Sequence, residues 1–166
     1  MPRISIAVVG PGEDAPRGAV EDATALGRLI AERGWVTLTG GRDAGVMRAA
    51  TRGATEAGGV TVGILPGTNK HDAAPDLAIA LATGLGEARN AVLVTAADAV
   101  IACGMNPGTA SEVALAVKAQ KPTVLVRPTA EAAAFVAQIA GPAAVYIAET
   151  PEAAVDWVAQ QTAALY

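Results

Sequence analysis

The feature of this sequence that most restricts its fold is a regular alternation between short apolar runs and longer helix-periodic segments. The apolar runs consist almost entirely of Val, Ile, Leu, Ala and Thr, and most are followed by glycine or proline. The segments between them place apolar residues three or four positions apart, as Val20, Ala23, Leu26 and Ile30 do, which indicates helices. We predict strands at residues 4–9, 35–38, 60–65, 77–82, 99–103, 123–126 and 144–147, and helices at residues 17–33, 46–57, within 84–96, 107–119, 130–140 and 151–164.

Strands that are apolar along their whole length are buried on both faces, and helices between them connect parallel neighbours. Aromatic residues make up only 3% of the chain, so small aliphatic side chains must fill the core. We therefore predict an α/β fold over residues 1–166 as a single domain, with a doubly wound, mainly parallel sheet and helices on both faces. Such sheets bind ligands at the carboxyl ends of their strands, where the glycine clusters of this sequence fall.

Charge and composition exclude several classes of partner. The net charge is −4 and no cluster of Lys and Arg occurs, which argues against a nucleic-acid polymer as partner. No apolar run approaches the length of a membrane span and no signal peptide is recognisable, so we expect a cytoplasmic protein with no membrane partner. The single cysteine, Cys103, fits a reducing compartment and is interpreted as a core residue. His71 stands alone in a polar loop, so we expect no metal site.

The first glycine loop, from Gly10 through Gly12 to Ala15, matches the G-x-G-x-x-A pattern of dinucleotide-binding proteins. Two acidic residues inside the loop, Glu13 and Asp14, would repel a pyrophosphate. The second predicted strand also lacks the acidic residue that holds a ribose. We therefore do not expect NAD or FAD, although Gly10 and Gly12 are expected to keep the backbone clear of a neighbouring group.

The second cluster, LTGGRDAGVM, lies between a predicted strand and a helix. Backbone N–H groups at a helix start, with few Cβ atoms around them, can bind an anion. The same glycines are equally typical of a tight turn that needs positive φ angles. This cluster alone leaves both interpretations open. Its candidate ligand-binding residues are Gly40, Gly41, Arg42, Gly45 and Met47.

The third segment, GMNPGTASE, leads from an apolar strand into a helix, and it also has two interpretations. Thr109 with Glu112 three residues later is the spacing of a capping box, which satisfies backbone N–H groups within the helix. Alternatively, Gly108 and Thr109 bind a phosphate at the helix start, and Glu112 points toward whatever the phosphate carries. We favour the phosphate site. A fourth segment, GLGEARN, places Arg89 in another glycine-led helix.

Taken in order, LTGGRDAGVM, GLGEARNAV and PGTASEVAL resemble one family of Rossmann-like proteins often labelled lysine decarboxylases. That family includes the LONELY GUY (LOG) phosphoribohydrolases and, closer to this chain in length and loops, the molybdenum cofactor carrier-like proteins. The resemblance spans about residues 3 to 127. It implies a Rossmann-like sheet, a homodimer or larger homo-oligomer, and a small phosphorylated ligand such as a nucleoside 5′-monophosphate. By motif, it also implies that Arg89 and Glu112 act on an N-glycosidic bond, and that phosphate contacts come from Gly40, Gly41, Gly45, Gly108 and Thr109.

The chain departs from the LOG pattern where Met105 and Asn106 replace two glycines and Arg42 replaces a third. These changes affect the expected substrate more than the expected phosphate site. We therefore predict a binding protein for a phosphorylated nucleotide-type ligand or cofactor, similar to the molybdenum cofactor carriers. No cofactor is required in this reading, and an AMP-like nucleotide or the molybdenum cofactor is the expected bound ligand. The alternative is a hydrolase that cleaves nucleoside 5′-monophosphates, with Arg89 and Glu112 as its catalytic residues.

Overall fold

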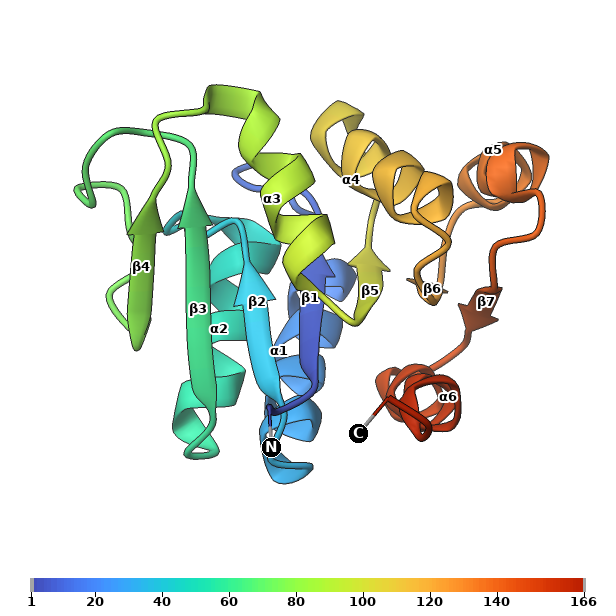
Figure 1. The fold of residues 1–166 in the computed structure, drawn as a ribbon, viewed down its shortest axis with the longest axis horizontal. Helices are drawn as coiled ribbons and strands as arrows, with labels where there is room; N and C mark the ends of the chain where they lie inside the picture. The colour runs from blue at the N-terminus through green and yellow to red at the C-terminus, as the bar shows by residue number, and fades with distance from the viewer. Residues whose placement is uncertain (1, 166) are drawn as a thin grey trace.

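Within residues 2–165, which a computed structural model describes, seven strands form one parallel sheet (Figure 1). Their order across the sheet is β4-β3-β2-β1-β5-β6-β7, and every neighbouring pair is parallel. The strands are β1 (Ser5–Val9), β2 (Val36–Thr39), β3 (Val60–Leu65), β4 (Ile79–Ala82), β5 (Ala99–Cys103), β6 (Thr123–Val126) and β7 (Val145–Ala148).

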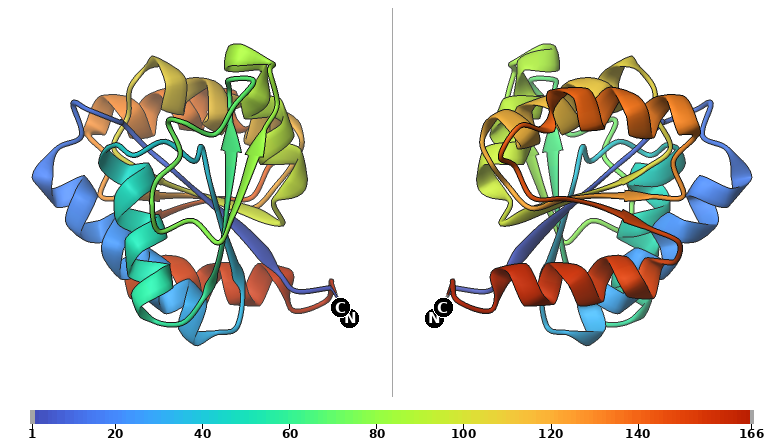
Figure 2. Two further views of the ribbon diagram at one scale, coloured as in Figure 1. Left: turned by 90° about the vertical axis from the view of Figure 1, so that its left-hand side faces the viewer. Right: turned by 90° about the vertical axis from the view of Figure 1, so that its right-hand side faces the viewer.

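Helices cover both faces of this sheet, as the two side views in Figure 2 show. One face packs against α1 (Arg17–Glu32), α2 (Gly45–Glu56) and α6 (Pro151–Thr162). The other packs against α3 (Arg89–Ala96), α4 (Pro107–Lys118) and α5 (Ala130–Ala140). Small aliphatic side chains fill both interfaces, as the low aromatic content predicts. In this part of the chain, no helix is long and apolar enough to cross a membrane.

The chain changes direction across the sheet between β1 and β5. From β1 it proceeds outward through β2 and β3 to β4, and it then returns to place β5 on the other side of β1. β1 and β5 run in register, with Ile6 beside Ala99 and Val9 beside Ala102. The loops that leave these two strands therefore diverge toward opposite faces, which opens a crevice at their carboxyl ends.

The predicted fold class is confirmed, and the element boundaries move by only a few residues. β4 begins at Ile79 rather than at residue 77, and α6 ends at Thr162 rather than at residue 164. The helix expected within residues 84–96 is divided into a short 3-10 turn, η1 (Gly86–Ala88), and α3. Gly86 has a φ of 55°, a conformation that an α-helix cannot contain, so the helical segment cannot extend back through this residue.

Candidate functional site

A small polar cavity lies at the carboxyl ends of β1 and β2, between the first turns of α2, α3 and α4. Its volume is about 130 Å³. We call it the glycine-loop cavity. Its lining residues are Val8, Val9, Gly10, Gly12, Gly40, Arg42, Met47, Glu87, Arg89, Asn90, Asn106, Gly108, Thr109 and Glu112.

The structure brings nearly all of the predicted site residues together in this cavity. Of the predicted site residues, only Gly41 and Gly45 lie outside its lining. Five lining residues were not predicted from the sequence: Val8, Val9, Glu87, Asn90 and Asn106. Asn106 had a usable signal, because asparagine is favoured immediately before a helix and proline at its first position. Val8 and Val9 line the cavity because they are the last two residues of β1. Their residue type gives no sign of this position.

Three of the glycines are required by protein packing. A Cβ atom on Gly10 would lie 2.3 Å from the carbonyl oxygen of Cys103, and one on Gly45 would lie 2.0 Å from the oxygen of Gly12. A Cβ atom on Gly40 would lie 2.6 Å from Nη1 of Arg89. These glycines let the three loops approach one another closely, so their presence alone does not indicate a ligand.

Gly108 differs from these three. A Cβ atom there would meet only Oδ1 of Asn106, at 3.5 Å, which is an ordinary contact. Gly108 is also not one of the described residues that have a positive φ angle. Neither packing nor backbone conformation therefore requires glycine at position 108. The space beside Gly108 belongs to the cavity and is open to a ligand.

The start of α4 is capped by Asn106, so the capping-box interpretation of Thr109 and Glu112 is wrong. The side chain of Asn106 accepts hydrogen bonds from the backbone N–H and the hydroxyl of Thr109, both at 2.9 Å. Thr109 is the third residue of the helix, not its cap. An anion at this helix start can use the Gly108 N–H directly, but it must compete with Asn106 for the Thr109 N–H.

Arg89 is buried, and its guanidinium binds backbone carbonyl groups. It donates to the carbonyl oxygens of Gly40 and Ile64, and its Nε donates to Oδ1 of Asn90 at 2.9 Å. Burial lowers the pKa of Arg89, while the nearby Glu112 carboxylate opposes that shift. The side chain thus ties the ends of β2 and β3 to α3 and adds positive charge to the cavity wall.

Glu112 is 8% exposed and faces the same cavity from α4. Within residues 2–165, no group donates a hydrogen bond to its carboxylate. Burial raises the pKa of Glu112 to about 7, although the attraction of Arg89 acts in the opposite direction. Near neutral pH, this carboxyl group can therefore accept or release a proton when a charged ligand enters.

Cys103 lies at the end of β5 and is fully buried. Burial is the main reason that the pKa of its thiol rises to about 12, and the nearby Asp22 adds to the shift. The thiol remains protonated at neutral pH and is a poor nucleophile. Its interpretation as a core residue agrees with this environment.

Comparison with known proteins identifies the family of this chain. Residues 3–155 match the family model of the SLOG cluster4 family. The chain belongs to the SLOG cluster4 family. An uncharacterised protein from Archaeoglobus fulgidus is 41% identical over 129 residues, which cover 77% of this chain and 83% of that protein.

Two solved structures align with this SLOG cluster4 protein over nearly its whole length. The molybdenum cofactor binding protein of Rippkaea orientalis is 45% identical, with a TM-score of 0.94 and coverage of 97% of this chain and 98% of that one. The molybdenum cofactor carrier protein of Chlamydomonas reinhardtii is 41% identical, with a TM-score of 0.91 and coverage of 98% and 99%. The chain is thus similar to cofactor carriers in both sequence and structure.

The loop at residues 68–76 of this SLOG cluster4 protein packs beside the second glycine cluster. The Ala74 N–H donates to the oxygen of Gly41 at 2.8 Å, and the Asp43 N–H donates to the oxygen of Asp72 at 3.2 Å. None of the residues of this loop lines the glycine-loop cavity. The loop supports the glycine cluster from outside.

Proposed function

We propose that this protein is a cytoplasmic carrier of the molybdenum cofactor and that the phosphorylated end of the cofactor binds in the glycine-loop cavity. The similarity over nearly the full length to two cofactor-binding structures supports this function. The position of the cavity, at the carboxyl ends of parallel strands, supports the location. The molybdenum cofactor is a phosphorylated pterin derivative and would here be cargo.

The size of the glycine-loop cavity fits one end of such a ligand. Its volume of about 130 Å³ is well below the range of roughly 300–1,000 Å³ typical of pockets that enclose a whole small molecule. A phosphate group fits that space, and the open position beside Gly108 allows it to approach the helix start. Arg42, in the loop after β2, and Arg89, at the start of α3, supply positive charge.

The presence of Glu112 suggests that binding is coupled to a proton. A carboxylate beside a phosphate is unfavourable, but a carboxyl group with a pKa of about 7 can be neutral when the phosphate arrives. The protonated group could then donate a hydrogen bond to a phosphate oxygen. We expect the affinity for a phosphorylated ligand to fall as pH rises through 7.

We also infer that the protein forms a homodimer or a larger homo-oligomer. Large apolar side chains are exposed on the edge strand β4, at Ile79 and Leu81, and on the surface of α5, at Phe135 and Ile139. Exposed apolar groups of this size are commonly covered by another subunit. Sedimentation at micromolar concentration should therefore show a species larger than the 16.5 kDa monomer; a monomer alone would contradict this inference.

The carrier function can be tested by purifying the protein from two hosts, one that synthesises the molybdenum cofactor and one that does not. We expect molybdenum and pterin to co-purify in equal amounts from the first host only. Addition of the released cofactor to protein from the second host should raise its melting temperature. No pterin in the first preparation and no stabilisation of the second would contradict the function.

The alternative hydrolase remains a prediction from the family resemblance. Against a catalytic use of Arg89, its guanidinium is already engaged by the carbonyl oxygens of Gly40 and Ile64. Assays of base release from AMP and from an N6-substituted AMP test this alternative. Release that is lost in Glu112→Gln would favour the hydrolase over the carrier.

A further inference from the structure

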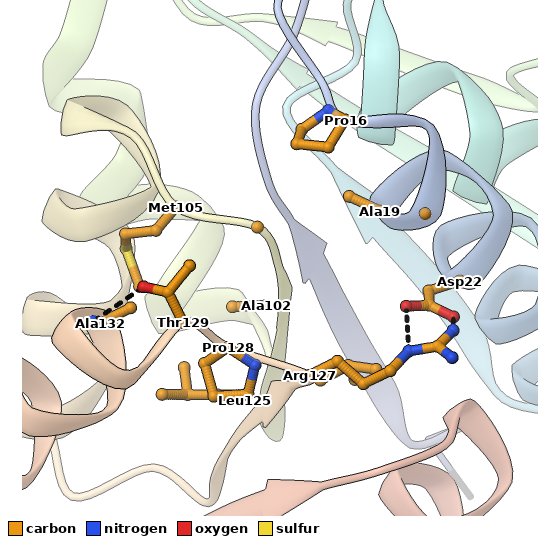
Figure 3. Close-up of a pocket in the computed structure, with 13 residues that line it drawn as sticks. Pro16, Ala19, Asp22, Ala102, Met105, Leu125, Arg127, Pro128, Thr129 and Ala132 are labelled. Carbon is orange, nitrogen blue, oxygen red and sulfur yellow. Dashed lines mark hydrogen bonds and ion pairs between the residues drawn. The ribbon is translucent and has the colours of Figure 1, made fainter.

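A second cavity, of about 390 Å³, lies at the carboxyl ends of β5 and β6 (Figure 3). We call it the Asp22 cavity. None of its lining residues is shared with the glycine-loop cavity. Its walls come from the first two turns of α1, the start of α5, the ends of β5 and β6 and the segments that follow these strands: Pro16, Gly18, Ala19, Asp22, Ala102, Gly104, Met105, Leu125, Val126, Arg127, Pro128, Thr129 and Ala132.

The turn between β5 and α4 separates the two cavities. Gly104 and Met105 line the Asp22 cavity, whereas the next residue, Asn106, lines the glycine-loop cavity. Gly104 has a φ of 79°, and a Cβ atom there would lie 3.0 Å from the ring of Pro11. The first and third glycine loops therefore pack against each other here. The two cavities therefore lie on either side of this turn and share no lining residue.

The walls of the Asp22 cavity are mainly apolar, with one ion pair on the side formed by α1. Nε and Nη2 of Arg127 donate to the two carboxylate oxygens of Asp22, the first at 3.1 Å. The Asp22 side chain is only 7% exposed, whereas that of Arg127 is 53% exposed. The pair places hydrogen-bond acceptors and donors side by side without net charge.

An ion pair of this kind selects against ligands that carry a full charge. The Asp22 carboxylate repels an anion, and the Arg127 guanidinium repels a cation. Each carboxylate oxygen still has a lone pair beyond the one used by Arg127, since a carboxylate accepts about four hydrogen bonds. A flat, uncharged ring with neighbouring N–H and carbonyl groups satisfies both partners, and the apolar walls cover its faces.

The backbone at Arg127 supports a role for its side chain. Its φ is 45°, in the left-handed region that disfavours residues other than glycine, and its N–H donates to the oxygen of Ala148 at 2.9 Å. A non-glycine residue held in this region often has a function that outweighs the strain. Here the side chain at that position neutralises Asp22 in the cavity wall.

We propose that the Asp22 cavity binds a planar, uncharged heterocycle that presents an amino group and a ring N–H beside a carbonyl group, the edge shared by pterins and guanine. Asp22 accepts from the two N–H donors, and Arg127 donates to the carbonyl oxygen. This proposal deepens the proposed function and rests on it in one respect, since the pterin of the cofactor is one source of such a ring. A free guanine nucleoside is the other.

The test is a binding titration with neopterin and with guanosine, which contain neither phosphate nor metal. We expect Asp22→Asn to weaken neopterin binding by about tenfold or more, because it removes hydrogen bonds to a charged acceptor. Glu21→Gln, which changes the neighbouring exposed carboxylate on the same helix, should leave binding unchanged. Should Asp22→Asn fail to fold, Ala132→Leu fills the cavity from α5, with the exposed Ala134→Leu as its control.

The source of the ring is identified by competition. Displacement of neopterin by the released molybdenum cofactor assigns the cavity to the pterin of the cofactor. Tighter binding of guanosine than of neopterin, without competition by the cofactor, assigns it to a guanine compound. No binding of either ring, or equal binding by the folded Ala132→Leu variant and wild type, would overturn the proposal. Cofactor binding that persists in that case would leave the proposed function intact.

Discussion

The two cavities of this protein differ in the way their walls are built. The glycine-loop cavity is small and polar, and its wall is made of glycine backbone and of charged side chains that include Arg42, Arg89 and Glu112. The Asp22 cavity has about three times that volume, is mainly apolar, and contains a paired Asp and Arg. The first is suited to an anionic group and the second to a flat ring. A bipartite ligand such as a phosphorylated pterin has both parts.

The largest expected effect is on the pH dependence of stability, and it distinguishes the carboxyl group of Glu112 in the glycine-loop cavity from that of Asp22 in the other cavity. The pKa of Glu112 rises in the folded protein from 4.5 to about 7, so folding favours its protonated form. The stability that this group adds is fully present below pH 4.5 and is lost as pH rises to about 7. The loss amounts to at most about 3 kcal/mol. We expect Glu112→Gln to flatten this part of the stability curve, as measured by urea unfolding between pH 4 and 8.

Asp22→Asn is the comparison for that measurement, because it changes the carboxylate of the other cavity. It should leave the slope between pH 4.5 and 7 in place. If Glu112→Gln retains the full slope, then Glu112 is not the group whose pKa is raised, and its proposed coupling to phosphate binding fails.

The next effect is on ligand affinity and comes from a comparison of two glycines. Gly108 and Gly18 are each the second residue of a helix, and each has open space where a Cβ atom would be. Alanine at either position should leave stability unchanged or raise it by up to about 1 kcal/mol. We expect only Gly108→Ala to weaken binding of inorganic phosphate, which lacks the ring proposed for the Asp22 cavity that Gly18 lines. The loss should be about tenfold, which corresponds to about 1.4 kcal/mol. Equal affinity in the two variants would place the phosphate elsewhere.

Thr109→Val tests what the start of α4 contributes to the glycine-loop cavity. The buried Thr109 hydroxyl donates to Asn106, so its loss should lower the free energy of unfolding by about 1 kcal/mol. If the hydroxyl also contacts phosphate, affinity should fall by about 1–3 kcal/mol in addition. Denaturant unfolding and calorimetric titration of the same variant measure the two quantities. A change in stability alone would limit Thr109 to holding Asn106.

The smallest effect concerns backbone conformation beside the Asp22 cavity. Gln120 and Arg127 are the non-glycine residues with positive φ in the described chain, at 54° and 45°. Gln120→Gly should stabilise the fold by about 0.5–1 kcal/mol, since glycine relieves the strain. Arg127→Gly relieves the same strain but leaves the buried Asp22 carboxylate unpaired, so we expect it to stabilise less or to destabilise. Equal stabilisation in thermal melts would mean that the ion pair contributes nothing.

The sequence predicts the glycine-loop cavity better than the Asp22 cavity for a physical reason. The first is built from local motifs, because glycines and helix starts follow strands whose ends meet at one edge of the sheet. Its least predictable part is the rotation of side chains, such as the turn of Asn106 toward Thr109. The second depends on Asp22 in α1 and on Arg127 directly after β6, which are 105 positions apart in the sequence.

The fold could be predicted from the sequence about as well as the glycine-loop cavity. Apolar runs fix the strands, and threonine, a preferred residue at helix starts, caps α5 at Thr129 and α6 at Thr150. The order of the strands and the positive φ of Arg127 leave no trace in residue type. Asp22 in particular has the sequence context of an exposed helix residue, yet it is buried by a partner from a distant loop.

The most direct test of the central claim is a structure of the protein with the molybdenum cofactor bound. The account predicts that the phosphate lies within hydrogen-bond distance of the Gly108 N–H in the glycine-loop cavity, with the Asn106 side chain displaced from the Thr109 N–H. A cofactor whose phosphate lies elsewhere on the protein, with the glycine-loop cavity unchanged around Gly108, would contradict it.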